Sequence, residues 1–160
     1  MVNIEYLMKT GMISRINELE LDRYCGFFSA ASQDNLEHSK ANRNTFPRWS
    51  IISAYYAMHD MTKLFLAKRY RIKIDYKVHM TTIHVLRHVL KDKKLLSLLE
   101  KGHEEFLAMA NDLAEAKKER VKVQYYTGTL YLKELYRKRA EEFDRQVVMP
   151  FLAKMQRLIQ

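Results

Sequence analysis

Turn-forming residues are unusually scarce in this chain, which contains only four glycines and two prolines in 160 residues. A β-sandwich or β-barrel needs a turn signal about every ten residues, and Gly and Pro supply most of those signals. Leu, Met, Lys, Glu, Arg and Ala are abundant instead, and these side chains lose little conformational freedom in a helix. The sequence therefore predicts an all-α protein.

Hydrophobic residues at helical spacing predict about five helices, at residues 13–36, 47–70, 79–90, 93–123 and 130–159. Segment 47–70 is apolar on nearly all sides and is expected to be the central, most buried helix. Pro47 suits a first helical turn, whereas Pro150 should kink the last helix near Val147. Because the connections are short and no linker divides the chain, we expect one domain, residues 1–160, folded as an up-and-down antiparallel bundle.

Basic residues outnumber acidic ones by 28 to 19, which gives a formal net charge of +9. The excess is concentrated in residues 46–91, where nine basic and two acidic side chains leave a net charge of +7. A balance of this sign favours phosphate-containing ligands such as RNA or nucleotides, or an acidic protein partner.

The single cysteine, Cys25, cannot form an internal disulfide, so we expect a reducing, cytoplasmic location. Its neighbours in the sequence include neither a His nor an Asn, and we expect a small buried side chain rather than a nucleophile. No run of about eighteen apolar residues is present, so we expect no membrane-spanning segment.

Polar side chains form one stripe on the otherwise apolar segment 47–70. Tyr56, His59, Asp60 and Lys63 lie at positions i, i+3, i+4 and i+7, which share one helix face. One interpretation is a polar groove between helices that holds a phosphate or a base. The alternative is an internal ion pair, such as Asp60 with Lys63, that only fixes the packing of the helix.

Two further patterns bear on metals and cofactors. His84 and His88 have a spacing that can place two imidazoles on one metal, but the HExxH pattern is absent and no third ligand lies nearby. Glycine-rich phosphate loops and the GxSxG motif are also absent from the sequence. We therefore expect neither a metal site nor a cofactor.

Basic residues stand beside an aromatic pair in KKERVKVQYYTG, residues 117–128. Arg120 and its basic neighbours could position a phosphate, while Tyr125 and Tyr126 could stack on a base. The alternative is that one tyrosine belongs to the core and the other covers a helix junction.

Two stretches together resemble a known family. RWSIISAYYAMHDMTKLFLAKRY (residues 48–70) and VHMTTIHVL (residues 78–86) resemble the central helix pair of HEPN domains, the higher eukaryote and prokaryote nucleotide-binding domains. ERVKVQYY (residues 119–126) is similar to the Arg-containing motif region of that family. The resemblance implies a helical bundle that commonly forms a homodimer, and many members are metal-independent ribonucleases paired with a minimal nucleotidyltransferase.

The chain departs from the motif of the active members, in which an Arg is followed after four to six residues by a His. Here Arg120 is followed at that offset by Tyr125, which is a poor base at neutral pH. We therefore expect a HEPN-like protein that binds a nucleotide or RNA through Arg120, Tyr125, Tyr126, His59, Asp60 and Lys63 and lacks the ribonuclease activity. Two alternatives are a ribonuclease that uses Tyr125 or His59, and an interaction module that docks an acidic partner such as a nucleotidyltransferase.

Overall fold

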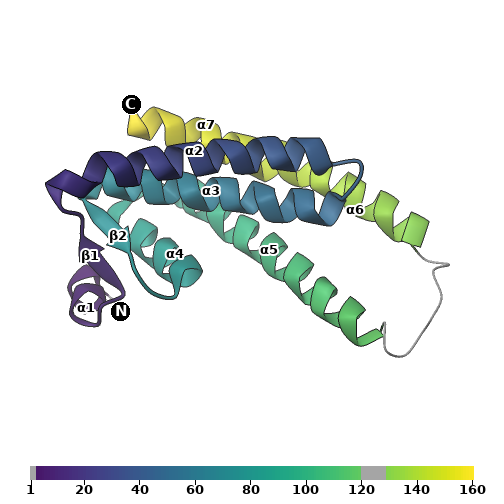
Figure 1. The fold of residues 1–160 in the computed structure, drawn as a ribbon, viewed down its shortest axis with the longest axis horizontal. Helices are drawn as coiled ribbons and strands as arrows, with labels where there is room; N and C mark the ends of the chain where they lie inside the picture. Colours follow the sequence, from purple (N-terminus) through teal and green to yellow (C-terminus); the bar gives the residue numbers. More distant parts are fainter. Residues whose placement is uncertain (1–2, 120–128) are drawn as a thin grey trace.

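Helix α3 (Pro47–Tyr70) forms the centre of an all-α bundle in the computed structural model, which describes residues 3–119 and 129–160 (Figure 1). Ile51, Tyr55, Met58 and Leu66 on this helix are completely buried. The predictions of an all-α bundle and of a buried central helix at 47–70 are therefore confirmed.

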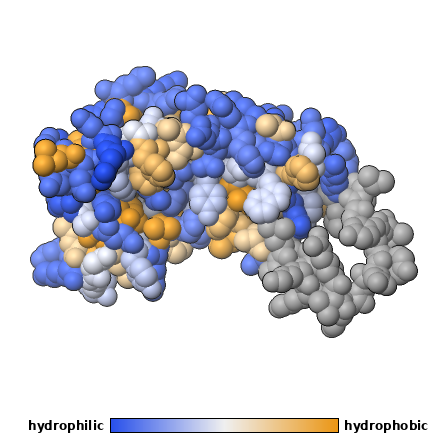
Figure 2. Space-filling model, in the orientation of Figure 1, coloured by the Kyte–Doolittle hydropathy of each residue, from blue (hydrophilic) through white to orange (hydrophobic). Residues whose placement is uncertain are grey.

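The remaining elements surround α3. They are α1 (Ile4–Lys9), β1 (Ile13–Arg15), α2 (Glu18–Asn42), β2 (Ile72–Ile74), α4 (Val78–Val89), α5 (Lys93–Glu119), α6 (Thr129–Phe143), a π-helical segment (Asp144–Val148) and α7 (Met149–Ile159). Helices α2 and α7 lie along α3, while α4 and α5 lie below it in Figure 1. On the face seen in Figure 2, hydrophilic residues cover the α2 side, and hydrophobic ones gather below it. In the described residues, no helix is both long and apolar enough to cross a bilayer.

The first long helix begins later than predicted, because residues 13–15 form a strand instead of a helical turn. Ile13 pairs with Ile74 and Arg15 with Ile72 in an antiparallel two-stranded sheet of β1 and β2. Asn17 then caps α2, since its side-chain oxygen accepts a hydrogen bond from the amide of Leu19 at 3.2 Å. The sequence prediction missed this cap.

Helix α2 also extends past the predicted end, because its polar residues bond to α3 instead of breaking the helix. Ser50 donates to the carbonyl oxygen of Ser39 at 2.7 Å, and Ser32 donates to that of Ala57 at 2.8 Å. The His38 ring lies 2.7 Å from the hydroxyl of Ser53. Small hydroxyl side chains therefore allow the two helices to pack closely without leaving buried polar atoms unpaired.

The last helix is distorted where the kink was predicted. Pro150 lacks an amide proton, and its ring would clash with the carbonyl group four residues earlier in a regular helix. The π-helical segment Asp144–Val148 comes directly before α7, and its wider turn makes room for the proline. The chain therefore continues in one direction from α6 to α7.

Candidate functional site

The predicted polar stripe on α3 contains one buried carboxylate, that of Asp60, which is 7% exposed. Lys63 Nζ and His59 Nδ1 each lie 3.9 Å from Asp60 Oδ1, and Asn35 of α2 donates to Asp60 Oδ2 at 3.1 Å. The Lys63 ammonium also lies 4.7 Å from the centre of the Phe28 ring. We call these five residues the Asp60 network. The Asp60–Lys63 ion pair of this network is the internal contact that the sequence analysis gave as the alternative to a ligand-binding groove.

The structure describes only some of the predicted site residues. His59, Asp60 and Lys63 lie together, but His59 is only 1% exposed, and its Nε2 is directed at the carbonyl oxygen of Val78, 3.4 Å away. Arg120, Tyr125 and Tyr126 lie outside the described residues.

A second group of side chains lies beside the Asp60 network, at the junction of three helices. Tyr55, Tyr56 and His59 come from α3, His79 from the first turn of α4, and His103 and Phe106 from α5; we call these six residues the imidazole–aromatic cluster. Sequence analysis identified Tyr56 and His59 of this group and missed the other four.

The shortest hydrogen bond that the structure gives for the cluster joins Tyr55 to His79. The Tyr55 hydroxyl lies 2.9 Å from His79 Nδ1, and Tyr55 is completely buried. This bond connects α3 to the first turn of α4. It also occupies one of the two ring nitrogens of His79.

Three rings of the cluster, those of His79, His103 and Phe106, lie nearly parallel to one another, whereas the Tyr56 ring is edge-on to its neighbours. His79 stacks on Phe106 with centroids 5.1 Å apart and an interplanar angle of 26°. His79 and His103 have centroids 5.9 Å apart at 22°, and Tyr55 stacks on Phe106 at 4.9 Å. His79, His103 and Phe106 are partly buried, so the stack reaches the surface. A surface of parallel flat rings can receive a further flat ring such as a nucleic-acid base.

Gly102 allows α5 to bring His103 and Phe106 over Tyr55. A Cβ atom at Gly102 would lie 3.1 Å from both Sδ and Cε of Met58 and 3.4 Å from Cδ2 of Tyr55. By helix propensity alone, a glycine at this position weakens α5. In the fold it permits the close approach of α5 to α3.

Replacement of Gly102 by leucine should lower the free energy of unfolding by about 1 kcal/mol, because overpacking against Met58 exceeds the gain in helix propensity. Gly26 of α2 provides a matched control, since a Cβ atom there meets no atom within 4 Å. Gly26→Leu should therefore stabilise the protein by about 0.5 kcal/mol. Urea titration of both variants measures the difference, and equal effects would contradict the assigned role of Gly102.

The imidazoles of the cluster are held in their neutral form. Burial, followed by the nearby rings of His59 and His103, lowers the pKa of His79 from 6.5 to about 4. Burial also lowers the pKa values of His59 and His103. At neutral pH each ring therefore has one nitrogen that donates a hydrogen bond and one that accepts.

Some ring nitrogens of the cluster remain available to a ligand. His79 Nε2 and both nitrogens of His103 have no hydrogen-bond partner among the described residues, and none of them is a buried atom. His59 Nδ1 differs, because it is buried and also has no hydrogen-bond partner among the described residues. The surface of the cluster thus presents neutral imidazole donors and acceptors next to stacked rings.

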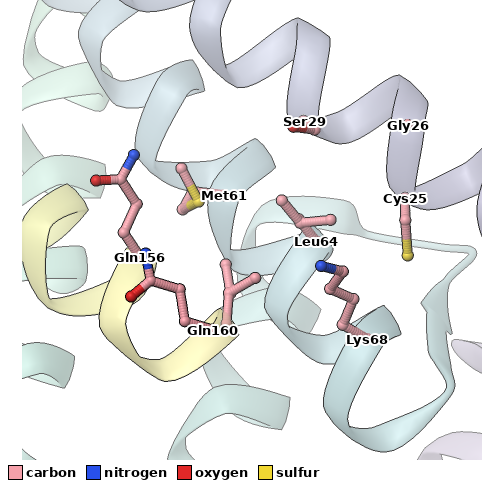
Figure 3. A pocket seen from close by; sticks show the side chains of 9 residues that line it. Cys25, Gly26, Ser29, Met61, Leu64, Lys68, Gln156 and Gln160 are labelled. Atoms are coloured by element: carbon pink, nitrogen blue, oxygen red, sulfur yellow. The ribbon is translucent and has the colours of Figure 1, made fainter.

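A separate groove of about 450 Å³ lies between α2, α3 and α7 (Figure 3). Cys25 and Ser29 line it from α2, Leu64 and Lys68 from α3, and Gln156 from α7. Burial raises the pKa of the Cys25 thiol, so this cysteine is a weak nucleophile at neutral pH. Cys25 is 8% exposed, which confirms the prediction of a small buried side chain.

Within residues 3–119 and 129–160, no group of three or more His, Cys, Asp or Glu side chains has a geometry that could hold a metal ion. In the His84 and His88 pair, the ring of His88 lies 2.9 Å from the backbone oxygen of His84. The three imidazoles of the cluster are likewise not arranged around a common point that could hold an ion.

A signal for the missed residues is present in the sequence. His79 lies four and seven residues before Ile83 and Leu86, and therefore on the apolar face of its helix. His103 directly follows Gly102 and precedes Phe106 by three residues, which places His103 and Phe106 on one side of α5. Histidines on apolar helix faces, together with His59, would have indicated a shared site.

Comparisons of the chain with models of protein families, with curated proteins and with solved structures gave no match. The candidate site therefore rests on its own geometry.

Proposed function

We propose that this protein is a HEPN-like domain that binds RNA or a nucleotide, with the imidazole–aromatic cluster as the place where a base and its phosphate are received. The observation that carries the proposal is the stack of His79, His103 and Phe106, whose free imidazole nitrogens reach the surface. Bases stack on aromatic rings with little dependence on sequence, and imidazole nitrogens can bond to base edges or phosphate oxygens.

The charge of the chain supports the same proposal. Lys77 directly precedes α4 and Lys101 lies two residues before His103, and both side chains are exposed. The net charge of +9 favours binding to the phosphate backbone. Arg120, Tyr125 and Tyr126 belong to the proposal as additional contacts supplied by the segment after α5.

The buried members of the predicted stripe have a supporting role in this proposal. His59 packs against His79 with ring centroids 4.8 Å apart. Asp60 and Lys63 join α3 to α2 through the contacts with Asn35 and Phe28. We therefore assign contact with the ligand to His79 and His103, and support of those rings to His59, Asp60 and Lys63.

Replacement of His103 by alanine should weaken binding of a fluorescent single-stranded RNA about tenfold, because a stacking surface is lost. The ring nitrogens of His103 have no protein partner in the described residues, so the change should leave the fold intact. His88→Ala provides a matched control on the exposed side of α4, and Arg120→Ala tests the segment after α5.

Fluorescence anisotropy across a salt series measures this effect, with circular dichroism as the check of folding. Affinity of the unmodified protein should fall steeply with salt as phosphate contacts are screened. Equal affinities of the His103→Ala and His88→Ala variants would remove the cluster from the proposal.

Metal-independent RNA cleavage is a second candidate function, and the surface imidazoles His79 and His103 favour it. Neutral imidazoles can accept a proton from a ribose hydroxyl and return one to the leaving oxygen. Gel analysis of the same RNA samples in EDTA tests this function. Cleavage that disappears in His103→Ala would support a ribonuclease, whereas intact RNA would support binding alone.

We further propose, from the resemblance to HEPN domains, a cytoplasmic homodimer with a minimal nucleotidyltransferase as its partner. Light scattering of the purified protein tests the dimer.

If RNA does not bind, docking of an acidic protein to the basic surface becomes the preferred function.

A further inference from the structure

We propose that Tyr55 is a positioning residue that fixes His79 in the tautomer with its proton on Nε2, so that the site receives a phosphate oxygen. This inference rests on the proposed function, because it names the chemical group that the same site binds. It starts from the hydrogen bond between the Tyr55 hydroxyl and His79 Nδ1, which is 2.9 Å long.

The direction of that bond follows from the burial of Tyr55. The phenol is completely buried, and His79 Nδ1 is its hydrogen-bond partner in the described residues. If Nδ1 carried the proton and donated it, the hydroxyl proton of Tyr55 would be left buried without an acceptor, which is unfavourable. The phenol is therefore the donor, and Nδ1 is the acceptor.

A neutral imidazole carries a single proton, so acceptance at Nδ1 places the proton on Nε2. Nε2 has no protein partner in the described part of the chain and is not buried. The site thus presents an N–H group that needs an acceptor. A second hydrogen-bond donor or an apolar edge at this point would leave that group without a bond, whereas an oxygen of a phosphate would satisfy it.

The surroundings of His79 favour phosphate over the carbonyl oxygen of a base. His79 lies in the first turn of α4, and the exposed ammonium group of Lys77 directly precedes that helix. Asp75, the nearest acidic residue in the preceding segment, is engaged with Lys73 at 3.6 Å. A cation two residues before His79 in the sequence could therefore contribute to binding of a phosphate.

The first test is nuclear magnetic resonance of the unliganded protein, with proton–nitrogen correlations recorded through two bonds for the ring of His79. We expect the pattern of the Nε2–H tautomer at neutral pH. A proton on Nδ1 would overturn the inference whatever the protein binds, and this measurement needs no variant.

The second test uses Tyr55→Phe, which removes only the hydroxyl, with Tyr56→Phe as the matched control on the same helix. Tyr55→Phe should give a mixture of the two tautomers at His79, whereas Tyr56→Phe should keep the pattern of the unmodified protein. A merely structural role of Tyr55 would not move this spectroscopic signature. An unchanged His79 pattern in folded Tyr55→Phe would contradict the assignment.

The third test identifies the acceptor by titration with uridine monophosphate, uridine and inorganic phosphate, observed at the His79 ring. We expect a large shift of the His79 ring signals with the two phosphate-containing ligands, a smaller one with uridine, which can only stack, and about fivefold weaker binding of uridine monophosphate by Tyr55→Phe. Equal shifts with uridine, or none with any ligand, would overturn the phosphate assignment. Phosphate binding at His79 without RNA binding would instead reject the proposed function and keep this inference.

Discussion

Replacement of Asp60 by alanine is expected to lower the free energy of unfolding by about 3 kcal/mol. Asp60 is 7% exposed and is the ion-pair partner of Lys63, whose side chain is 13% exposed. Removal of the carboxylate leaves a largely buried ammonium group without its counter-charge and Asn35 without its acceptor. Burial already lowers the pKa of Lys63, which shows that the charged form is disfavoured there.

The controls for Asp60 separate the buried ion pair from the general effect of losing a charge. Glu5→Ala removes the exposed Glu5–Lys9 pair, whose side chains are 73% and 74% exposed, and should change stability by less than about 0.5 kcal/mol. Lys63→Met combined with Asp60→Leu should recover much of the loss, because neither charge is then left unpaired. Chemical unfolding measures all three, and a loss in Asp60→Ala no larger than in Glu5→Ala would exclude the structural role of the network.

Acidification from about pH 7 to about pH 4 is expected to lower the free energy of unfolding by on the order of 2 kcal/mol. The cause is the imidazole–aromatic cluster, in which His79 has a pKa of about 4 instead of 6.5. Between these two values the unfolded chain binds a proton at this site and the folded protein does not. Stability is therefore highest above about pH 6.5 and decreases as the pH falls through this window. Solvent reaches His79 and screens its charge, which keeps the effect below the full linkage value.

Nearby charged groups influence how the protonation of the cluster histidines changes with pH. Asp60 faces His59 and His79 and favours their protonation, whereas Lys63 opposes it, and Glu104 favours protonation of His103. Asp92 has a lowered pKa because it accepts a hydrogen bond from Lys154, so its contribution is lost only at lower pH. The histidine effect is thus confined to the range between about pH 6.5 and about pH 4.

The pH dependence is measured by thermal unfolding in buffers across that range. His79→Gln should flatten the curve, while His88→Gln, which lies outside the cluster, should keep its slope. A curve that stays flat in the unmodified protein down to about pH 4 would mean that the imidazoles are charged at no penalty in the folded state.

The central helix could be predicted from the sequence because both of its signals are local. Pro47 marks its start, and the apolar residues up to Tyr70 need no knowledge of their partners. The strand at residues 13–15 could not be found in this way, because it exists only through pairing with residues 72–74. A strand of three residues carries too little pattern of its own to compete with a neighbouring helix.

The candidate site was only partly predictable for the same reason. The stripe of His59, Asp60 and Lys63 follows from helix periodicity, and the structure confirms that these residues lie together. His79 and His103 approach His59 from other helices, and their approach depends on how closely Gly102 lets α5 pack on α3. Interhelical distances of this kind are set by tertiary packing, which periodicity does not report.

The small β-sheet couples the local stability of the N-terminal segment to that of the chain just before the first turn of α4. Met12 accepts hydrogen bonds from the amides of Asp75 and Tyr76 at 2.9 and 3.2 Å, just before the turn that carries His79. Two strands of three residues have no independent stability, so this pairing persists only while both sides are docked on the core. Local opening of residues 3–16 would therefore release the connection before α4 in the same event, and hydrogen exchange at β1 and at residues 75–76 would report one shared opening reaction.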